Sequence, residues 1–323
     1  MRRKLLFLLG FIGLVAATWL VVPAEFDSRL FWSSLREAHL WWIVGSIGAT
    51  FLGYAVRALR WKSLLGPLKH VRFGPLMSAT VVGFGAIFTV GRPGEVVRPI
   101  WINRQEGIPA IGAATSIIIE RVFDLIMLLA LFAVGSLWIE LPPQTQAVVG
   151  GLGTPWQWIS LGAVVLIGFT LLHRYAAHLA RLAPFEALRR LFETFTWGLA
   201  ATSTLRGFAV VTFYSVLLWV VHTLQFWLML ESVDLSYPVS ASIMTLVLTS
   251  FGSVAHVPGI GGGFQAGFIL SATAVLGTPA EVAIAASLMV WFITILPTVA
   301  AAAGYMMWKG ISVRDLRTQE LSP

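Results

Sequence analysis

Two short charged runs in apolar surroundings are the part of this sequence best suited to bind a polar group. The first is Gly91-Arg92-Pro93-Gly94-Glu95-Val96-Val97-Arg98-Pro99, and the second is Glu120-Arg121-Val122-Phe123-Asp124. Together they carry three guanidinium groups and three carboxylates. Charged side chains inside a membrane segment are costly unless they face one another, water or a ligand. The two runs are therefore the first candidates for a functional site.

The first run has the chemistry of an anion site. Arg92, Glu95 and Arg98 are spaced three residues apart, so a helix would place them on one face. Two guanidinium groups, glycines that allow close approach and the free N–H groups of a helix end suit a phosphate or another anion. Alternatively, the charges neutralise one another and only fix the conformation of the chain.

The second run places two acids on one helix face. Glu120 and Asp124 are four residues apart and repel each other unless a cation lies between them or one is protonated. Arg121 can reach Asp124, and Arg92 or Arg98 can cross from the first run. We therefore expect one network that joins the runs. It would serve binding, gating or proton coupling, or it would only lock the structure.

A glycine-rich turn is the third candidate. It reads Pro258-Gly259-Ile260-Gly261-Gly262-Gly263-Phe264-Gln265 and lies between two short apolar runs. The functional interpretation is a second helix end that faces the first run across a cavity. The alternative is a close helix crossing through small residues.

Several side chains outside these runs favour simpler roles. Arg57, Arg60 and Trp61 follow an apolar segment, and we expect them to contact lipid headgroups at the membrane interface. The alternative is that they line an opening toward lipid. We expect His222 and His256 to be hydrogen-bonded packing residues, with pH sensing as the alternative.

The composition sets the class of protein that carries these residues. The chain has 323 residues, of which 57% are hydrophobic and 11% charged, and it has no cysteine. Soluble domains are about a quarter charged, so this is a helical polytopic membrane protein. The net charge of +7 does not indicate nucleic-acid binding, because the basic residues border apolar segments. We expect no enzymatic activity, cofactor or metal ion, because no catalytic or metal-ligand group has convincing spacing.

The fold predicted is all-α, a single membrane domain over residues 1–323. About six full transmembrane helices are expected, together with two oppositely oriented re-entrant helical hairpins at about 76–104 and 240–277. A basic amphipathic segment at about 174–206 would lie on the membrane surface or form a solvated connector. The predicted full spans cover 5–22, 39–56, 111–138, 158–172, 208–230 and 282–308. Two interrupted segments of opposite sense are typical of an inverted-repeat transporter with a midplane site.

The basic residues predict the orientation in the membrane. With this topology, 16 of the 22 Lys and Arg residues fall on the side of the two termini, and only Arg29 and Arg36 fall opposite. The positive-inside rule then places both termini in the cytoplasm.

These motifs resemble the flippase-like membrane-domain family, the membrane half of bacterial lysylphosphatidylglycerol synthetase/flippase of the multiple peptide resistance factor type. The resemblance covers essentially the whole chain. It rests on four motifs, Arg57-x-x-Arg60-Trp61-x-x-Leu64-Leu65, Gly91-Arg92-x-Gly94-Glu95-x-x-Arg98-Pro99, Glu120-Arg121-x-x-Asp124 and Pro258-Gly259-x-Gly261. It implies movement of a phospholipid or polyprenyl-linked headgroup between the leaflets of a bacterial cytoplasmic (inner) membrane. A lipid-modifying enzyme or glycosyltransferase is the implied partner.

Two departures from the family pattern bear on the substrate. Ile260 stands where the family has glycine, and Gln265 stands at the position of a glutamate. The missing acid argues against a cationic headgroup or a proton step there. The chain is expected to be a stand-alone member without the soluble synthetase domain. The alternative functions are secondary transport of a small anionic solute and a non-catalytic role beside such an enzyme.

Overall fold

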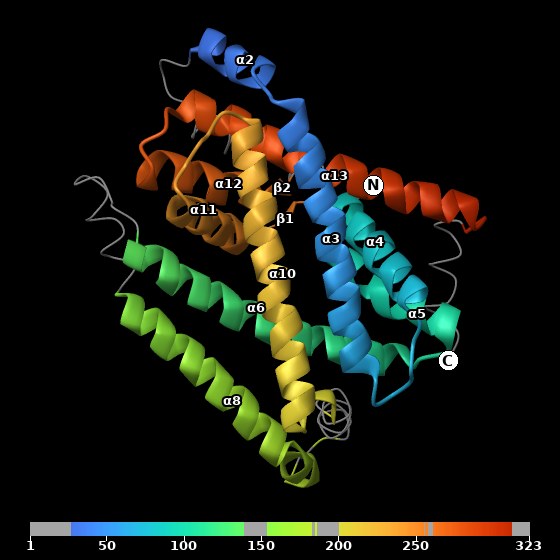
Figure 1. Cartoon of the computed structure of the whole chain (residues 1–323). Coiled ribbons are helices and arrows are strands. Elements are labelled where there is room, and N and C mark those ends of the chain that lie inside the picture. Colours follow the sequence, from blue (N-terminus) through green and yellow to red (C-terminus); the bar gives the residue numbers. More distant parts are fainter. Residues whose placement is uncertain are drawn as a thin grey trace.

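The protein is a bundle of helices in the computed structural model, which describes residues 27–138, 154–182, 185, 200–254, 256–257 and 261–311 (Figure 1). The expected first span at 5–22, Pro258 and Gly259 lie outside these residues. The described helices are α2 (Ser28–Arg36), α3 (Leu40–Leu65), α4 (Phe73–Val90), η1 (Arg92–Val96), α5 (Val97–Glu106), α6 (Ala110–Trp138), α8 (Pro155–Leu182), η2 (Ala200–Thr202), α10 (Leu205–Ser232), α11 (Val239–Gly252), α12 (Gly263–Leu270), η3 (Ser271–Val275) and α13 (Ala280–Trp308). Two-residue strands, β1 (His256–Val257) and β2 (Gly261–Gly262), pair antiparallel.

Four of the described helices, α3, α4, α10 and α13, are long and apolar enough to cross a membrane. The helices α6 and α8 have 29 and 28 residues, and α6 carries the second charged run. Helical structure is thus confirmed for five of the six expected spans, the sixth being residues 5–22. The helix α4 has 18 residues and begins at Phe73, earlier than expected, so its length alone does not distinguish a half-crossing from a full one.

One helix lies outside the expected spans. Residues 28–36 form α2, which begins where the Asp27 carboxylate accepts hydrogen bonds from the N–H groups of Arg29 and Leu30, at 2.8 and 3.3 Å. A side chain of this kind at the N-cap stabilises a short helix. The first residues of the expected amphipathic segment at 174–206 belong to α8, which continues to Leu182. Most of its remainder lies outside the described residues.

The helices α3 and α10 lie side by side through the centre of the bundle and run in opposite directions (Figure 1). The His39 N–H donates to the Ser232 carbonyl at 3.0 Å, so the start of α3 meets the end of α10. Further along, Gln225 Nε2 donates to Thr50 Oγ1 at 2.8 Å. This antiparallel pair is the frame on which the other elements are arranged.

Each central helix leads into a helical hairpin. Hairpin 1 consists of α4, η1 and α5 and follows α3, whereas hairpin 2 consists of α11, β1, β2, α12 and η3 and follows α10. Because α3 and α10 are antiparallel, the hairpins start from opposite ends of the pair. The packing is reciprocal: α4 packs against α13, while α11 packs against α6. The first helix of each hairpin therefore contacts the helix that directly follows the other hairpin.

Glycines allow both hairpins to close tightly. A Cβ atom on Gly94 would lie 2.5 Å from the backbone carbon of Ala86 in α4. A Cβ atom on Gly267 of α12 would lie 2.4 Å from the Leu248 carbonyl oxygen of α11. Real Cβ atoms do not approach backbone so closely, so these two positions require glycine for the observed helix contact.

Candidate functional site

Arg60 of α3 is the centre of a buried ion network between α3, α5 and α6. Its Nη1 lies 2.7 Å from Asp124 Oδ1, and its Nε lies 4.0 Å from Glu120 Oε1. The side chains of Arg60 and Glu120 are fully buried. Arg60 is thus the cation that lies between the two acids of α6. A cation between these acids was expected from the sequence, but it was not expected to be Arg60.

Arg98 connects hairpin 1 to the same network. Its Nη1 lies 2.8 Å from Glu120 Oε2, and its guanidinium lies over the Trp61 ring, 4.3 Å from the ring centroid. Gly83 of α4 leaves room for this side chain, because a Cβ atom there would lie 2.2 Å from Arg98 Cγ. Because of Gly83, the planar guanidinium of Arg98 can stack on the Trp61 ring and pair with the Glu120 carboxylate at the same time.

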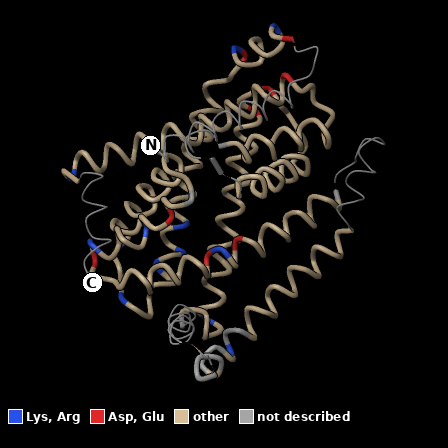
Figure 2. Tube along the Cα trace, turned by 180° about the vertical axis from the view of Figure 1, so that it is seen from behind, with Lys and Arg blue, Asp and Glu red and all other residues tan. Residues whose placement is uncertain are grey.

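Arg57 and Arg121 complete the network at its open edge. Arg57 Nη1 lies 3.2 Å from Asp124 Oδ2. Arg121 Nη1 lies 3.6 Å from the same oxygen, and its Nη2 lies 3.8 Å from Glu95 Oε1 of η1. Among the described side chains the network holds four guanidinium groups and three carboxylates, so these groups carry one positive charge in excess. Figure 2 shows basic and acidic positions close together within the bundle.

The network brings together most of the candidate residues. Arg98, Glu120, Arg121 and Asp124 meet as the sequence analysis expected, and Glu95 contacts Arg121. The other candidates lie elsewhere or are not fully described. Arg92 is the first residue of η1, but its side chain is outside the described part, Gly94 is buried under α4, Gly261 is in β2, and Gln265 is in the first turn of α12.

The structure buries Arg57, Arg60 and Trp61 inside the bundle, where they contact other helices and are not exposed on its surface. Their exposed fractions are 6%, 0% and 0%. The reason is that α3 does not end near Val56 but continues to Leu65, which turns these residues toward α6 and α10. Their spacing of three and one is the signal that would have found them, because it puts two arginines and an indole on one face of an apolar helix.

A cavity of about 430 Å³ adjoins the open edge of the network. Its walls come from both hairpins and from α3, α6, α10 and α13. The polar side chains of the lining are Arg57, Arg121, Asp124, His222 and Gln225 together with the hydroxyl residues Thr50, Tyr54, Thr249, Ser250, Ser253 and Thr294. The apolar side chains include Phe84, Phe88, Leu128, Phe226, Met229, Leu246, Phe251 and Phe264. The cavity can therefore receive a charged group beside Arg57 and Arg121, and it also offers aromatic and aliphatic surface.

His222 and Gln225 are uncharged polar residues of this wall. His222 was expected to be a hydrogen-bonded packing residue, whereas Gln225 was not among the candidates. His222 Nδ1 lies 3.2 Å from Gln225 Oε1, and His222 Nε2 lies 3.5 Å from Arg57 Nη2. Because the Gln225 oxygen accepts, Nδ1 carries the hydrogen, and the lone pair of Nε2 faces the guanidinium. This arrangement fits a neutral imidazole.

Two guanidinium nitrogens of cavity-lining residues have no hydrogen-bond partner among the described residues. Arg57 Nε and Arg121 Nε are buried and make no hydrogen bond to the described residues. Buried donors of this kind are costly unless a ligand or water satisfies them. Within the described residues, no group of three or more His, Asp or Glu side chains is placed to hold a metal ion. The arrangement therefore favours an anion and not a metal.

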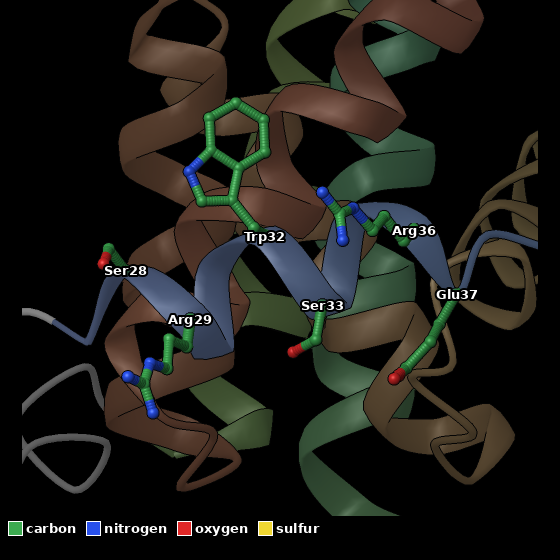
Figure 3. A pocket seen from close by; sticks show the side chains of 6 residues that line it. All are labelled: Ser28, Arg29, Trp32, Ser33, Arg36 and Glu37. Atoms are coloured by element: carbon green, nitrogen blue, oxygen red, sulfur yellow. The ribbon is translucent and has the colours of Figure 1, made fainter.

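A second hollow lies beside α2 and is unrelated to the network (Figure 3). Its volume is about 560 Å³, and Ser28, Arg29, Trp32, Ser33, Arg36 and Glu37 line it. All of these residues belong to one short helix and its C-cap, and Trp32 is 58% exposed. It is a hollow on the surface of α2 and not an enclosed site.

Comparison with protein families connects these features to known proteins. A sequence model of the family described as the lysylphosphatidylglycerol synthase TM region matches residues 7–302. The chain belongs to this family. No curated protein and no solved structure matches it. The family and the apolar helices identify a multi-pass membrane protein, whose membrane domain is related to lipid modification or flipping.

Proposed function

We propose that the protein moves a phospholipid or lipid-linked headgroup between the leaflets of the membrane, as a transporter and not as an enzyme. The observation that carries the proposal is the mixed lining of the central cavity. It contains the cations Arg57 and Arg121, several hydroxyl groups and many aromatic and aliphatic side chains. A lipid likewise joins an anionic headgroup to apolar chains.

The headgroup phosphate would lie beside Arg57 and Arg121 in the cavity. The described groups of the network carry one positive charge in excess, and Arg57 Nε and Arg121 Nε have no acceptor among the described residues. A phosphate oxygen at this position would satisfy both requirements, since guanidinium groups bind phosphate by paired hydrogen bonds. Arg98 would act indirectly, because it is fully buried against Glu120 and Trp61 and does not line the cavity.

The two hairpins suggest how access would alternate. They would enter the bilayer as re-entrant segments from opposite faces, because they start from opposite ends of the α3 and α10 pair. Arg121 contacts both Glu95 of hairpin 1 and Asp124 of α6, and its side chain is 39% exposed. It would exchange these partners when hairpin 1 moves. Such reciprocal halves are typical of transporters with a midplane site.

The location and partners proposed follow from the same features. The charge distribution supports the bacterial inner membrane with both termini in the cytoplasm, even though Arg57 and Arg60 are buried within the bundle. A lipid-modifying enzyme or glycosyltransferase would supply or consume the lipid that is moved.

Lipid movement in proteoliposomes tests the proposal. Fluorescent phospholipid that becomes accessible to a membrane-impermeant quencher reports transfer between leaflets. We expect Arg57→Gln and Arg121→Gln to slow transfer by about tenfold or more, because each removes a charged hydrogen-bond donor. Arg206→Gln changes an exposed arginine in the first turn of α10 and should have no effect.

Wild-type rates in both cavity variants would refute the assignment. Uptake of a small anion such as glycerol phosphate without lipid transfer would instead identify a solute transporter.

A further inference from the structure

An apolar groove runs along the outer side of the helices that enclose the central cavity. Its volume is about 450 Å³, and α6, α10 and the start of α11 form its walls. Its lining includes Met127, Leu131, Val134, Val220, Leu224 and Ile243. Several of these side chains are exposed, including Val220 at 58%. In a membrane-spanning helix such a surface faces hydrocarbon.

The helices α6 and α10 line both the groove and the cavity. On α10, His222 and Phe226 face the cavity, whereas Val220 and Leu224 face the groove. Trp219 belongs to both linings, and within the described residues it is the single side chain that does so. Its position places it where the cavity and the groove come closest.

The indole of Trp219 has an unused hydrogen-bond donor. The side chain is 9% exposed, and Nε1 is buried without an acceptor among the described residues. Its ring lies 5.8 Å from that of His222, which also lines the cavity. The nearby Thr223 hydroxyl donates to the Trp219 carbonyl at 2.9 Å, within the helix. Buried indole N–H groups usually find a partner, so an acceptor on a ligand is expected here.

We propose that the groove binds an acyl chain of the same lipid whose headgroup occupies the cavity, and that the Trp219 N–H donates to the ester carbonyl of this lipid. The inference rests on the proposed function and makes the substrate class narrower. An ester carbonyl lies between the headgroup and the chain of a glycerophospholipid, as Trp219 lies between the cavity and the groove. A polyprenyl phosphate has no such carbonyl. The substrate is therefore a diacyl phospholipid.

Lipid binding to the purified full chain in detergent micelles tests this proposal. The probes are phosphatidylglycerol with two ester-linked chains, its diether analogue, undecaprenyl phosphate and glycerol 3-phosphate. Val220→Trp fills the groove, and Val164→Trp is the matched control, because Val164 is 62% exposed on α8 and does not line the groove. Val220→Trp should weaken binding of the diester lipid by about tenfold, since the chain loses its apolar contact, and leave glycerol 3-phosphate unchanged.

The ester and ether lipids test the role of Trp219. We expect the wild type to prefer the diester by about fivefold, the usual effect of one buried hydrogen bond. Trp219→Phe keeps the ring but removes the N–H, so it should abolish this preference. If Trp219 has a purely structural role, Trp219→Phe should weaken the binding of both lipids equally.

Three results would overturn the inference. They are equal effects of Val220→Trp and Val164→Trp, equal binding of diester and diether lipids by the wild type, and tighter binding of undecaprenyl phosphate than of the diester. Arg57→Gln separates the two proposals. If Arg57→Gln does not weaken binding of any probe, the headgroup site itself is wrong. If it weakens phosphatidylglycerol and glycerol 3-phosphate while Val220→Trp acts like its control, only the acyl-chain site is wrong.

Discussion

Hairpins 1 and 2 occupy equivalent places in the two halves of the chain but differ in chemistry. Hairpin 1, residues 73–106, contains Arg92, Glu95, Arg98, Arg104 and Glu106, whereas residues 239–275 of hairpin 2 contain no Asp, Glu, Lys or Arg. Hairpin 1 is joined to α6 by a buried ion pair. Within hairpin 2, the Ser271 hydroxyl donates to Thr245 Oγ1 at 3.0 Å, a neutral contact between its two arms.

This difference shows that the repeated arrangement of helices and the charged site are separate properties. Both hairpins need close backbone contact, through Gly94 in one and Gly267 in the other. Only hairpin 1 contributes to the ion network. Both hairpins line the cavity with uncharged side chains, which are Phe84 and Phe88 in hairpin 1 and include Leu246, Phe251 and Phe264 in hairpin 2. The charged residues of the cavity lining therefore come from α3 and α6 and not from either hairpin.

The largest expected effect is the loss of Arg60. In Arg60→Ala, Asp124 keeps Arg57 and Arg121, but Glu120 keeps only Arg98, and two buried acids lose the cation between them. We expect destabilisation of about 3–5 kcal/mol, the usual cost of breaking a buried ion pair. Thermal unfolding of the purified protein in detergent measures it. Arg206→Ala, on the surface of α10, is the control, and an equal midpoint for both variants would contradict the central role of Arg60.

Removal of Arg98 should have a slightly smaller effect that a second change partly reverses. Arg98→Met costs about 3 kcal/mol, because Glu120 retains Arg60 at 4.0 Å. Adding Glu120→Gln removes the unpaired charge, so the double variant should be more stable than Arg98→Met alone. If the destabilisation of the double variant equals the sum of the effects of the two single variants, hairpin 1 is not held by the Arg98–Glu120 pair.

Substitution of the closely packed glycines should affect both hairpins equally. Gly94→Ala and Gly267→Ala each place a Cβ atom against backbone, and we expect a cost of about 1–3 kcal/mol in either hairpin. Gly74→Ala in α4 is the matched control, since no atom lies within 4 Å of its added Cβ. Unfolding midpoints of the three variants provide the test. A neutral result at Gly267 but not at Gly94 would mean that the hairpins do not share one packing principle.

The smallest effect is expected for the neutral contact of hairpin 2. Ser271→Ala removes one hydrogen bond, and Thr245 Oγ1 still donates to the Ala241 carbonyl at 2.9 Å. The expected cost is therefore about 0.5–1.5 kcal/mol, well below that of Arg98→Met. The unfolding midpoint of Ser271→Ala measures this cost. If Ser271→Ala costs as much as Arg98→Met, the contrast between a charged and a neutral hairpin is not energetic.

The sequence predicted the helices and the meeting of the two charged runs, but only part of the site. Apolar length and the glycine and proline breaks located the hairpins, and the cost of isolated charge made contact between Arg98 and Glu120 predictable. The role of Arg57 and Arg60 was not predictable, because it depends on how far α3 continues and on which face of α3 meets α6. The place of His222 and Trp219 in the cavity wall was also not predictable. A single polar side chain in an apolar helix shows its partner only when the helices are packed.

The reciprocal packing of α4 on α13 and α11 on α6 has a consequence for assembly. Each half of the protein supplies a helix against which the first hairpin helix of the other half packs. A chain divided between α8 and α10 should yield two fragments that are each degraded when made alone. The same fragments should insert and associate into one complex when they are made together in the same cell.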